Sequence, residues 1–357
     1  MKKVLIISTV GLNYEGITSV IYNYISHINS KDLQFEFIAY EGMDEQLRKK
    51  FEKLGRVLLV PKRKENIKGY IAALDKILNS CYDVVHVHGN SGTMVIETVL
   101  AKRHKVKTVI VHSHNTTCDH PVVYKMLTPL MKLNSDIYIG CSDAAGKWLF
   151  GRSKYIVLNN AIDLERFQFD PKVRENCREE LGLKDEYLIG HVGLFTEQKN
   201  HDFLIDVFFE FHKIMQEAKL LLVSDGPEFD RIKNKVSELK LTENVIFAGK
   251  RSDVYRLYQA MDLFLFPSLW EGLPLVMVEA QTNGLPLLVS DTITKDAKCT
   301  NRTLYKCLDD GAASWANEIW KLRSMNLLRS EDMKGDITRH GFDIVAESDK
   351  LKHIYLK

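Results

Sequence analysis

The stretch LFLFPSLWEGLPLVMVEAQTNGLP, residues 263–286, decides the fold. Its first four residues form an apolar run that is typical of a buried strand. Turn residues follow and lead to Pro274, which suits the first position of a helix because its missing N–H would have no helical partner there. Residues 275–282 continue as helix, and Asn283-Gly284 ends it. The stretch therefore predicts a strand, a loop and a helix in succession.

Two carboxylates flank this turn eight positions apart, Glu271 on the loop and Glu279 within the helix. Backbone N–H groups and the positive end of the helix dipole are available at such a loop, and they favour phosphate. Gly272 would let a ligand approach the backbone closely. Both carboxylates could face a single ligand. An isolated pair at this spacing would be read as two surface carboxylates on an ordinary strand, turn and helix.

The pair here comes with a preceding Pro-Ser, an intervening Gly-Leu-Pro and a closing Gly-Leu-Pro. This composite resembles the donor-site signature of the retaining glycosyltransferases of family 4, which have the GT-B fold. The resemblance implies that Glu271 orients a donor sugar and that Glu279 binds the ribose hydroxyls. It also implies that the amides after Glu271, those of Gly272 and Leu273, hold a diphosphate.

Short apolar or β-branched runs alternate with longer amphipathic segments along the whole chain. Such alternation indicates parallel sheets covered by helices on both faces. The expected strands are 4–8, 35–39, 57–60, 84–87, 108–112, 137–140, 155–158, 188–192, 220–223, 245–248, 263–266 and 287–289. The expected helices are 17–28, 44–54, 67–78, 93–102, 122–133, 143–150, 200–216, 229–240, 253–260, 274–283 and 311–327.

The alternation restarts after about residue 165, behind a polar, turn-rich linker. We therefore expect two doubly wound Rossmann-like domains, residues 1–163 and 164–340, facing across a cleft. The first would be an acceptor-side domain and the second would bind the nucleotide sugar. The resemblance adds that 341–357 is a terminal helix that crosses back to the first domain. This architecture alone also fits binding proteins and epimerases.

Composition is that of a soluble globular protein: 45% of the 357 residues are apolar and 27% are charged. No apolar run is long enough to span a bilayer, and the apolar stretch after Met1 is too short for a signal peptide. The cysteines form no paired framework, which favours reduced thiols in the cytoplasm. They are Cys81, Cys118, Cys141, Cys177, Cys299 and Cys307.

Positive charge gathers in the first domain. Residues 1–163 hold 22 Lys and Arg against 15 Asp and Glu, and the remainder holds 27 against 32. The excess is densest in Arg48–Lys68, which could be solvated surface or could contact an anionic membrane from its inner face. Aromatic residues for stacking bases are not interleaved with these charges, so nucleic acid is not an expected partner.

Two features of the first domain are candidate sugar or phosphate contacts. The loop after the first strand, VGLNYEG at 10–16, ends in Gly16, beside Glu15 where the family usually has a second glycine. His86, His88, His112 and His114 end two strands. Because no carboxylate or cysteine is interleaved with them, we expect no metal there. The family has a histidine near the donor sugar, a role that falls first on His114 and second on His112.

The loop GHVGLFTEQKNH, 190–201, resembles the family's G-R-x-x-x-x-K-N loop, which gives an Arg and a Lys to the diphosphate. Gly193 opens it, and Lys199 fits the Lys position as a point charge for phosphate. Leu194 stands at the Arg position, so another cation, Lys250 or Arg251, would have to substitute or activity would be reduced.

Two further turns follow strands of the second domain. Ser224-Asp225-Gly226-Pro227 resembles the family's G-D/E-G-P turn, which assigns Asp225 and Gly226 to the donor site. Residues 249–254, GKRSDV, include Lys250 and Arg251 and correspond to a segment that contacts the nucleotide base in relatives. Each turn alone would be an ordinary connection, but their order and spacing match.

The sequence as a whole predicts a retaining glycosyltransferase that uses a nucleotide-diphosphate sugar, with a UDP-sugar favoured. No Asp-x-Asp metal signature stands out, and relatives of this fold work without a divalent ion, so no cofactor is expected. The acceptor would be a glycan or lipid-linked glycan in capsule or exopolysaccharide synthesis. The alternatives are a nucleotide-sugar epimerase of the same fold and a non-enzymatic, transferase-like subunit, which Leu194 favours.

Overall fold

The computed structural model describes residues 1–13, 16–116, 121–325, 329 and 332–357, and it divides the chain into two compact units. Unit 1 comprises Met1–Ala161 together with Ile344–Lys357, and unit 2 comprises Ile162–Asp343. The boundaries expected from the sequence lie at 163/164 and 340/341. Each unit has its own sheet and its own hydrophobic cores, and each is described separately below.

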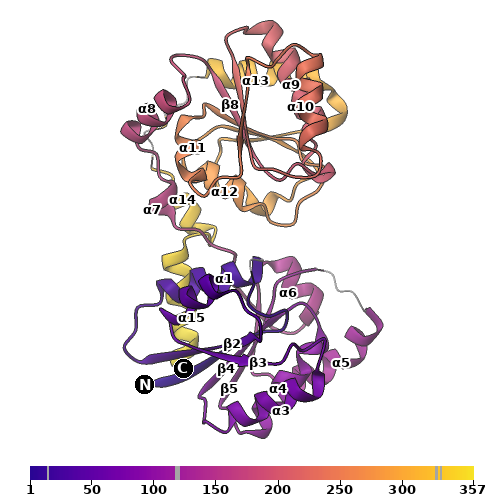
Figure 1. The fold of residues 1–357 in the computed structure, drawn as a ribbon, viewed down its shortest axis with the longest axis vertical. Coiled ribbons are helices and arrows are strands. Elements are labelled where there is room, and N and C mark those ends of the chain that lie inside the picture. Colours follow the sequence, from indigo (N-terminus) through magenta and orange to yellow (C-terminus); the bar gives the residue numbers. More distant parts are fainter. Residues whose placement is uncertain (14–15, 117–120, 326–328, 330–331) are drawn as a thin grey trace. The chain divides into compact units, whose positions relative to one another are not determined.

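Unit 1 is built on a parallel sheet of seven strands in the order β3-β2-β1-β4-β5-β6-β7. Figure 1 labels β2, β3, β4 and β5 of this sheet. The chain steps outward from β1 and then returns to its other side at β4, which is the doubly wound arrangement. The strands are β1 Lys2–Ser8, β2 Leu33–Tyr40, β3 Arg56–Val60, β4 Val84–Gly89, β5 Thr108–Ser113, β6 Ile137–Gly140 and β7 Ile156–Val157.

Helices cover both faces of this sheet. One face packs against α1, α2 and α15, and the other packs against α3, α4, α5 and α6. Alternate residues of strands β1 to β6 belong to opposite cores, as the two-residue period of a strand requires. The bounds are α1 Gly16–His27, α2 Glu45–Glu52, α3 Ile67–Leu78, η1 Gly92–Met94, α4 Val95–Arg103, α5 Pro121–Leu133, α6 Asp143–Phe150 and α15 Ile344–Leu356.

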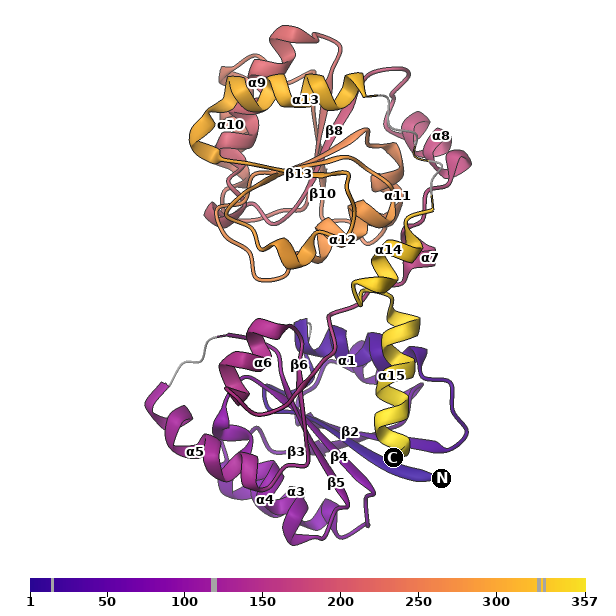
Figure 2. The same cartoon turned by 180° about the vertical axis from the view of Figure 1, so that it is seen from behind.

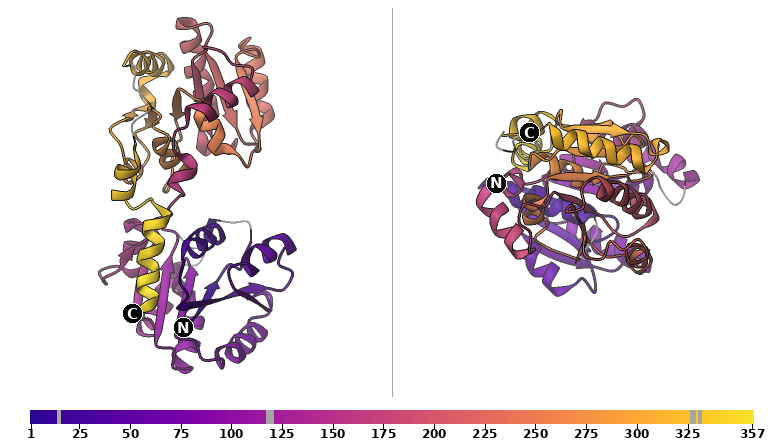
Figure 3. Two further views of the ribbon diagram at one scale, coloured as in Figure 1. Left: turned by 90° about the vertical axis from the view of Figure 1, so that its left-hand side faces the viewer. Right: turned by 90° about the horizontal axis from the view of Figure 1, so that it is seen from above.

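The helix α15 comes after all of unit 2 in the chain but packs in unit 1, as Figure 3 shows. Its Ser348 hydroxyl donates to the carbonyl of Tyr24 on α1 at 3.1 Å. Near its end, the Leu356 carbonyl accepts from the ammonium of Lys2 on β1, also at 3.1 Å. Helix α15 therefore belongs to unit 1.

Unit 2 repeats the doubly wound plan with six parallel strands in the order β10-β9-β8-β11-β12-β13. The strands are β8 Leu188–Val192, β9 Lys219–Val223, β10 Val245–Gly249, β11 Leu263–Phe266, β12 Leu287–Ser290 and β13 Thr303–Lys306. The fold class predicted from the sequence, two Rossmann-like parallel α/β domains, is therefore confirmed.

The unit 2 sheet is also covered on both faces. Helices α9, α10 and α13 pack over one face, as Figure 2 shows, and α8, α11 and α12 pack over the other. The bounds are α7 Leu164–Phe167, α8 Pro171–Glu180, η2 Glu197–Lys199, α9 His201–Ile214, α10 Phe229–Glu238, α11 Val254–Ala260, α12 Leu275–Thr282, η3 Lys295–Ala297, η4 Leu308–Asp310, α13 Ala312–Ser324 and α14 Lys334–Arg339. None of the described helices has the length and apolarity to span a bilayer.

Several local predictions were incomplete: the short helices α7 and α14 were not expected, and three further differences have a physical reason. Strand β13 was not expected, because Thr303–Lys306 is a short edge strand that contains few apolar residues. Helix α8 was not expected either, because its sequence is mostly polar, although Asp170 caps it and Pro171 begins it. Pro274 is the N-cap of α12 rather than its first helical residue, a shift of one position.

Candidate functional site

The strand order of unit 2 reverses between β8 and β11, which lie side by side in the sheet. In doubly wound folds the loops that leave the carboxyl ends of such a strand pair diverge to opposite faces, and ligands bind in the space they leave. The two loops here are 193–200, after β8, and 267–274, after β11. They are the same two loops that carry Lys199 and Glu271.

Lys199 and Glu271 form an ion pair, with 2.6 Å between Nζ and Oε1. The side chains are mostly buried, at 16% and 7% exposed. Gln198 joins the same contact, because its amide nitrogen donates to the Trp270 carbonyl at 2.8 Å and to Glu271 Oε2 at 3.2 Å. The structure thus brings together two of the predicted site residues from opposite sides of the switch point.

The backbone of both loops holds this pair in place. The Leu269 N–H donates to the Gln198 carbonyl at 2.8 Å, and the Asn200 side chain donates to the Pro267 carbonyl at 3.2 Å. Gly193 leaves the room that the Lys199 stem occupies, because an added Cβ would lie 3.1 Å from Lys199 Cδ. The Lys199 ammonium also lies 5.0 Å from the centre of the Phe266 ring.

Glu279 lies on α12 and accepts a hydrogen bond from the buried Tyr258 hydroxyl of α11, with 2.8 Å between the oxygens. Burial raises the pKa of Glu279, while the Tyr258 hydrogen bond and the charge of Arg166 act in the opposite direction. Tyr258 holds Oε2, and within the described residues Oε1 has no hydrogen-bond partner. Oε1 therefore remains available to a hydroxyl of a ligand.

The turn at Asp225-Gly226 packs directly on the loop that carries Lys199. The Phe195 N–H donates to the Asp225 carbonyl at 2.9 Å. Gly226 has a φ of +152°, and an added Cβ would stand 2.6 Å from the Phe195 nitrogen. The position therefore excludes any side chain, and Asp225 itself is exposed.

The cations suggested as substitutes at the Leu194 position differ in availability. Arg251 makes a bidentate contact with Asp253, at 2.7 and 2.6 Å, while Lys250 is exposed. Leu194 itself is 54% exposed, so no packing requires an apolar side chain there.

Gly272 is also exposed, and an added Cβ there would meet nothing within 4 Å. Leu273 is half-buried beside it.

In unit 1 the predicted loop VGLNYEG is described only in part, because Tyr14 and Glu15 lie outside the described residues, as does Cys118. Gly16 begins α1, and an added Cβ there would meet nothing within 4 Å. The start of this loop lines a cavity of about 420 Å³ at the carboxyl ends of β1, β2 and β3. Lys62 and Lys64 of the basic stretch also line this cavity.

His114 follows β5 and is part of a stack of four imidazoles. Its Nε2 lies 2.9 Å from His88 Nδ1, and its ring centre lies 4.2 Å from that of His112. Burial lowers the pKa of His114 to about 3, and it lowers the pKa of His112 and its neighbours as well. These imidazoles are therefore neutral at physiological pH. The role at a donor sugar that the sequence assigned to His114 stays a prediction.

Two partners of the site were not found from the sequence. Gln198 is adjacent to Lys199 in the quoted loop, but nothing in the local pattern showed that it would reach Glu271. Tyr258 lies 21 positions before Glu279, and only the packing of α11 against α12 brings them together. The sequence around Tyr258 has no pattern from which a hydrogen bond between its hydroxyl and a carboxylate could be predicted.

Comparison with known proteins places this architecture in a class. The fold aligns over 100% of both chains with that of Anabaena HepE solved with UDP and glucose, at a TM-score of 0.76 and 16% identity. It aligns over 99% of both chains with WaaG, a glycosyltransferase of lipopolysaccharide biosynthesis, at a TM-score of 0.66 and 16% identity. The fold is therefore GT-B.

The sequence comparisons are more specific. Residues 173–296 match the family model described as glycosyl transferases group 1. The EpsF protein of Bacillus subtilis (strain 168), named as a glycosyltransferase, is 28% identical over 97% of this chain and 94% of its own length. A UDP-Gal:α-D-GlcNAc-diphosphoundecaprenol α-1,3-galactosyltransferase of Escherichia coli is 26% identical over 82% of this chain and 80% of its own length. The protein is a glycosyltransferase that carries a group 1 domain in unit 2.

Proposed function

We propose that the protein transfers a sugar from a nucleotide-diphosphate sugar, with UDP as the favoured nucleotide, to a lipid-linked glycan acceptor, and that it retains the anomeric configuration. The observation that carries the proposal is the Lys199–Glu271 pair at the switch point of unit 2. It puts one cation and one carboxylate beside the N-terminus of α12, where phosphate is favoured.

The donor chemistry follows from these groups. A diphosphate gains negative charge as it leaves, and groups that bind this charge lower the barrier. Lys199 and the backbone amides after Glu271 would bind that charge. Glu271 would accept hydrogen bonds from sugar hydroxyls, and Glu279 Oε1 would accept them from the ribose.

The retaining course would need no separate base. The departing phosphate can take the acceptor's proton on the face that it leaves, so the protein supplies charge and orientation rather than proton transfer. No residue of the described site is then required as a general base. A divalent ion is not part of this proposal, because Lys199 and the amides fill the electrostatic role.

The acceptor class is supported by the relatives rather than by the described side chains. One relative is named for transfer to a diphosphoundecaprenol-linked sugar, and another, AmsD of Erwinia amylovora, is named for amylovoran biosynthesis. A role in cell-surface polysaccharide synthesis fits these names. The cavity beside Lys62 and Lys64 in unit 1 offers cations that a diphosphate-linked acceptor could use.

The test is a panel of UDP-, GDP-, ADP- and dTDP-sugars, each incubated with the full chain in the presence and absence of short-chain polyprenyl-diphosphate sugars. We expect slow nucleotide release without acceptor and fast release with one acceptor, and product analysis by NMR gives the anomeric configuration. Interconversion of the donor sugar without transfer would instead support the epimerase alternative. An inverted linkage would contradict the retaining course while leaving the transfer itself intact.

A further inference from the structure

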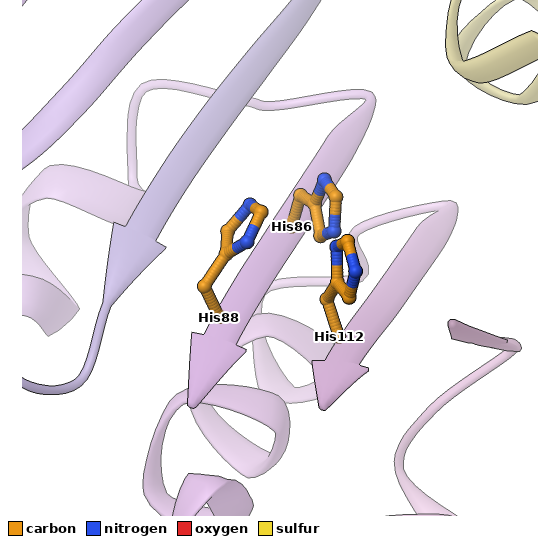
Figure 4. Close-up of side chains that lie close together, drawn as sticks. All are labelled: His86, His88 and His112. Carbon is orange, nitrogen blue, oxygen red and sulfur yellow. The ribbon is translucent and has the colours of Figure 1, made fainter. Parts of the chain in front are cut away.

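Three histidines of unit 1 lie on one face of two neighbouring strands. His86 and His88 are two residues apart on β4, so both rings point to the same side of the sheet. His112 on β5 is the register partner of His88. One ring nitrogen from each of the three lies within 4.8 Å of those of the other two, and Figure 4 shows the rings gathered side by side.

The rings are buried and only partly hydrogen-bonded. His86 is 0% exposed and His112 is 1% exposed. Within the described part of the chain, both ring nitrogens of His112 and Nε2 of His86 have no hydrogen-bond partner. A neutral imidazole has one N–H donor and one lone pair, and leaving them unpaired in a buried site is unfavourable. These nitrogens therefore call for a ligand or a solvent molecule.

Two of the three rings, those of His86 and His88, already make a hydrogen-bond contact through Nδ1. His86 Nδ1 lies 2.7 Å from the hydroxyl of Tyr355 on α15, and His88 Nδ1 lies 2.9 Å from His114 Nε2. Imidazoles that bind metals usually have their other nitrogen hydrogen-bonded in this way, which fixes the ring and its tautomer. The two contacts leave Nε2 of His86 and Nε2 of His88 as the nitrogens that can bind a cation.

A small cavity adjoins the cluster. It has a volume of about 10 Å³, and His88, His112, Tyr24 and Tyr355 line it together with aliphatic side chains of α1 and α15. A space of this size is on the scale of a single water. It offers room for a fourth, solvent-derived ligand next to His88 and His112.

We propose that His86, His88 and His112 bind a first-row divalent cation, with Zn²⁺ as the best fit and water as the fourth ligand. Three imidazoles and a water are a known tetrahedral zinc set, and imidazole also suits Cu²⁺ and Ni²⁺. Zinc–nitrogen bonds of about 2.1 Å place the nitrogens about 3.4 Å apart in a tetrahedron, so binding would draw the three nitrogens, now within 4.8 Å of one another, closer together. The sequence alone argued against a metal because no carboxylate or cysteine is interleaved, but the strand register supplies three imidazoles.

The position of the cluster indicates what the ion does. It lies beneath α1 and α15, and one of its ligands is hydrogen-bonded to Tyr355 on α15. A bound ion would fix His86 and therefore strengthen the attachment of α15 to the sheet of unit 1. The ion would therefore act on the stability of unit 1, and none of its three ligands belongs to the Lys199–Glu271 pair of unit 2.

The test uses the full chain with any polyhistidine tag removed and with metal stripped by a chelator. We expect one Zn²⁺ per chain in a competition titration against a chromogenic chelator, and visible absorption of tetrahedral intensity when Co²⁺ is added. His112→Asn should lower the affinity by at least about 100-fold, and Tyr355→Phe by about 10- to 100-fold, the range for loss of an outer partner. Zn²⁺ should also raise the melting temperature of the wild type.

The matched control is His201→Asn, which removes a buried histidine of unit 2 whose ring nitrogens also have no described partner. This variant should bind Zn²⁺ as the wild type does. Circular dichroism shows whether each variant is folded, and if His112→Asn does not fold, His88→Asn takes its place. Wild-type protein that binds no Zn²⁺ or Co²⁺ at micromolar concentration would overturn the proposal, as would variants that bind as tightly as the wild type.

Discussion

Lys199 and Glu271 hold each other at 2.6 Å across the two loops that leave β8 and β11. The pair is enclosed, so each charge is compensated mainly by the other. A diphosphate that binds beside Lys199 must compete with Glu271 for the ammonium group. The same event would free the Glu271 carboxylate for sugar hydroxyls, which couples the two halves of donor binding.

Replacing Lys199 with Ala should abolish measurable transfer. The loss should be at least the ~10²–10³-fold that is typical of one oxyanion donor, because no second cation stands at the Leu194 position. Initial rates with the preferred donor measure it. Lys213→Ala, which removes a lysine on α9 that pairs with Glu210, is the matched control and should transfer normally. Transfer by Lys199→Ala at the wild-type rate would mean that the diphosphate is held elsewhere.

Replacing Glu271 with Gln should separate binding from turnover. Without the carboxylate, Lys199 is no longer held by a competing anion, so UDP should bind at least as tightly as it does to the wild type. Transfer should fall by 10-fold or more because the sugar loses its acceptor of hydrogen bonds, a change of about 1.4 kcal/mol in the barrier. Calorimetry with UDP and rate measurements give the two values. Parallel losses of affinity and rate would contradict this separation.

Replacing Leu194 with Arg should keep or raise the transfer rate. The position is 54% exposed, so an Arg can be placed there without disturbing the core. A guanidinium near the diphosphate would share the charge that Lys199 otherwise binds alone. The informative comparison is the double variant with Lys199→Ala, whose rate should exceed that of Lys199→Ala by itself. A rate unchanged by the added Arg in both backgrounds would show that position 194 does not face the phosphates.

Replacing Glu279 with Gln should change how stability depends on pH. Burial raises the pKa of Glu279, so the folded state is penalised for the ionised form at pH values above that pKa. The penalty disappears as the pH falls through the raised pKa towards the ordinary value. Gln carries no charge and still accepts from Tyr258, so its melting temperature should exceed that of the wild type at pH 7.5, and the difference should shrink towards pH 4.5. A difference that stays constant with pH would remove this carboxylate as its cause.

The basic stretch Arg48–Lys68 should bind anionic vesicles in a salt-dependent way. Several of its charges are already paired, among them Arg48 with Glu52 and Arg63 with the buried Glu97, while Lys64 and Lys68 are exposed. Lys64→Glu with Lys68→Glu should therefore weaken binding, at about 1 kcal/mol per lysine near the surface.

Co-sedimentation with phosphatidylserine vesicles measures this binding, and phosphatidylcholine vesicles serve as the neutral reference. Lys172→Glu with Lys233→Glu makes the same charge change on exposed helices of unit 2 and should have little effect. If the wild type sediments equally with both kinds of vesicle, the stretch is ordinary solvated surface.

The sequence predicted the strand pattern well where apolar runs are continuous. Strands β6, β8 and β11 have the bounds expected for them, and β8 and β11 are fully buried runs between clear turns. The sequence did not predict β13, because an edge strand needs few apolar residues. It did not predict α8 either, because this polar helix has a recognisable N-cap but only a weak apolar stripe. An element that is buried on both faces has a continuous apolar run that can be recognised in the sequence. An element that is only partly buried lacks this run.

The sequence motifs of the candidate site indicate single residues but not the contacts between them. The loop motifs pointed to Lys199, Glu271 and Glu279, yet the pairing of Lys199 with Glu271 spans 72 residues and depends on the strand order. The histidine cluster is a second case in which the contacts could not be predicted from the spacing of residues in the sequence. The spacing of His86 and His88 is local, but only the register of β4 against β5 places His112 beside them.

The placement of α15 has a consequence for how the protein is made. Unit 2 is a continuous segment, whereas unit 1 needs a helix that is translated only after unit 2 is complete. At 5–20 residues per second, the strands of unit 1 would wait on the order of ten seconds or more for the helix that covers them. During that interval the apolar face beneath α15, with its imidazoles, would be open to chaperones and to solvent ions on the ribosome.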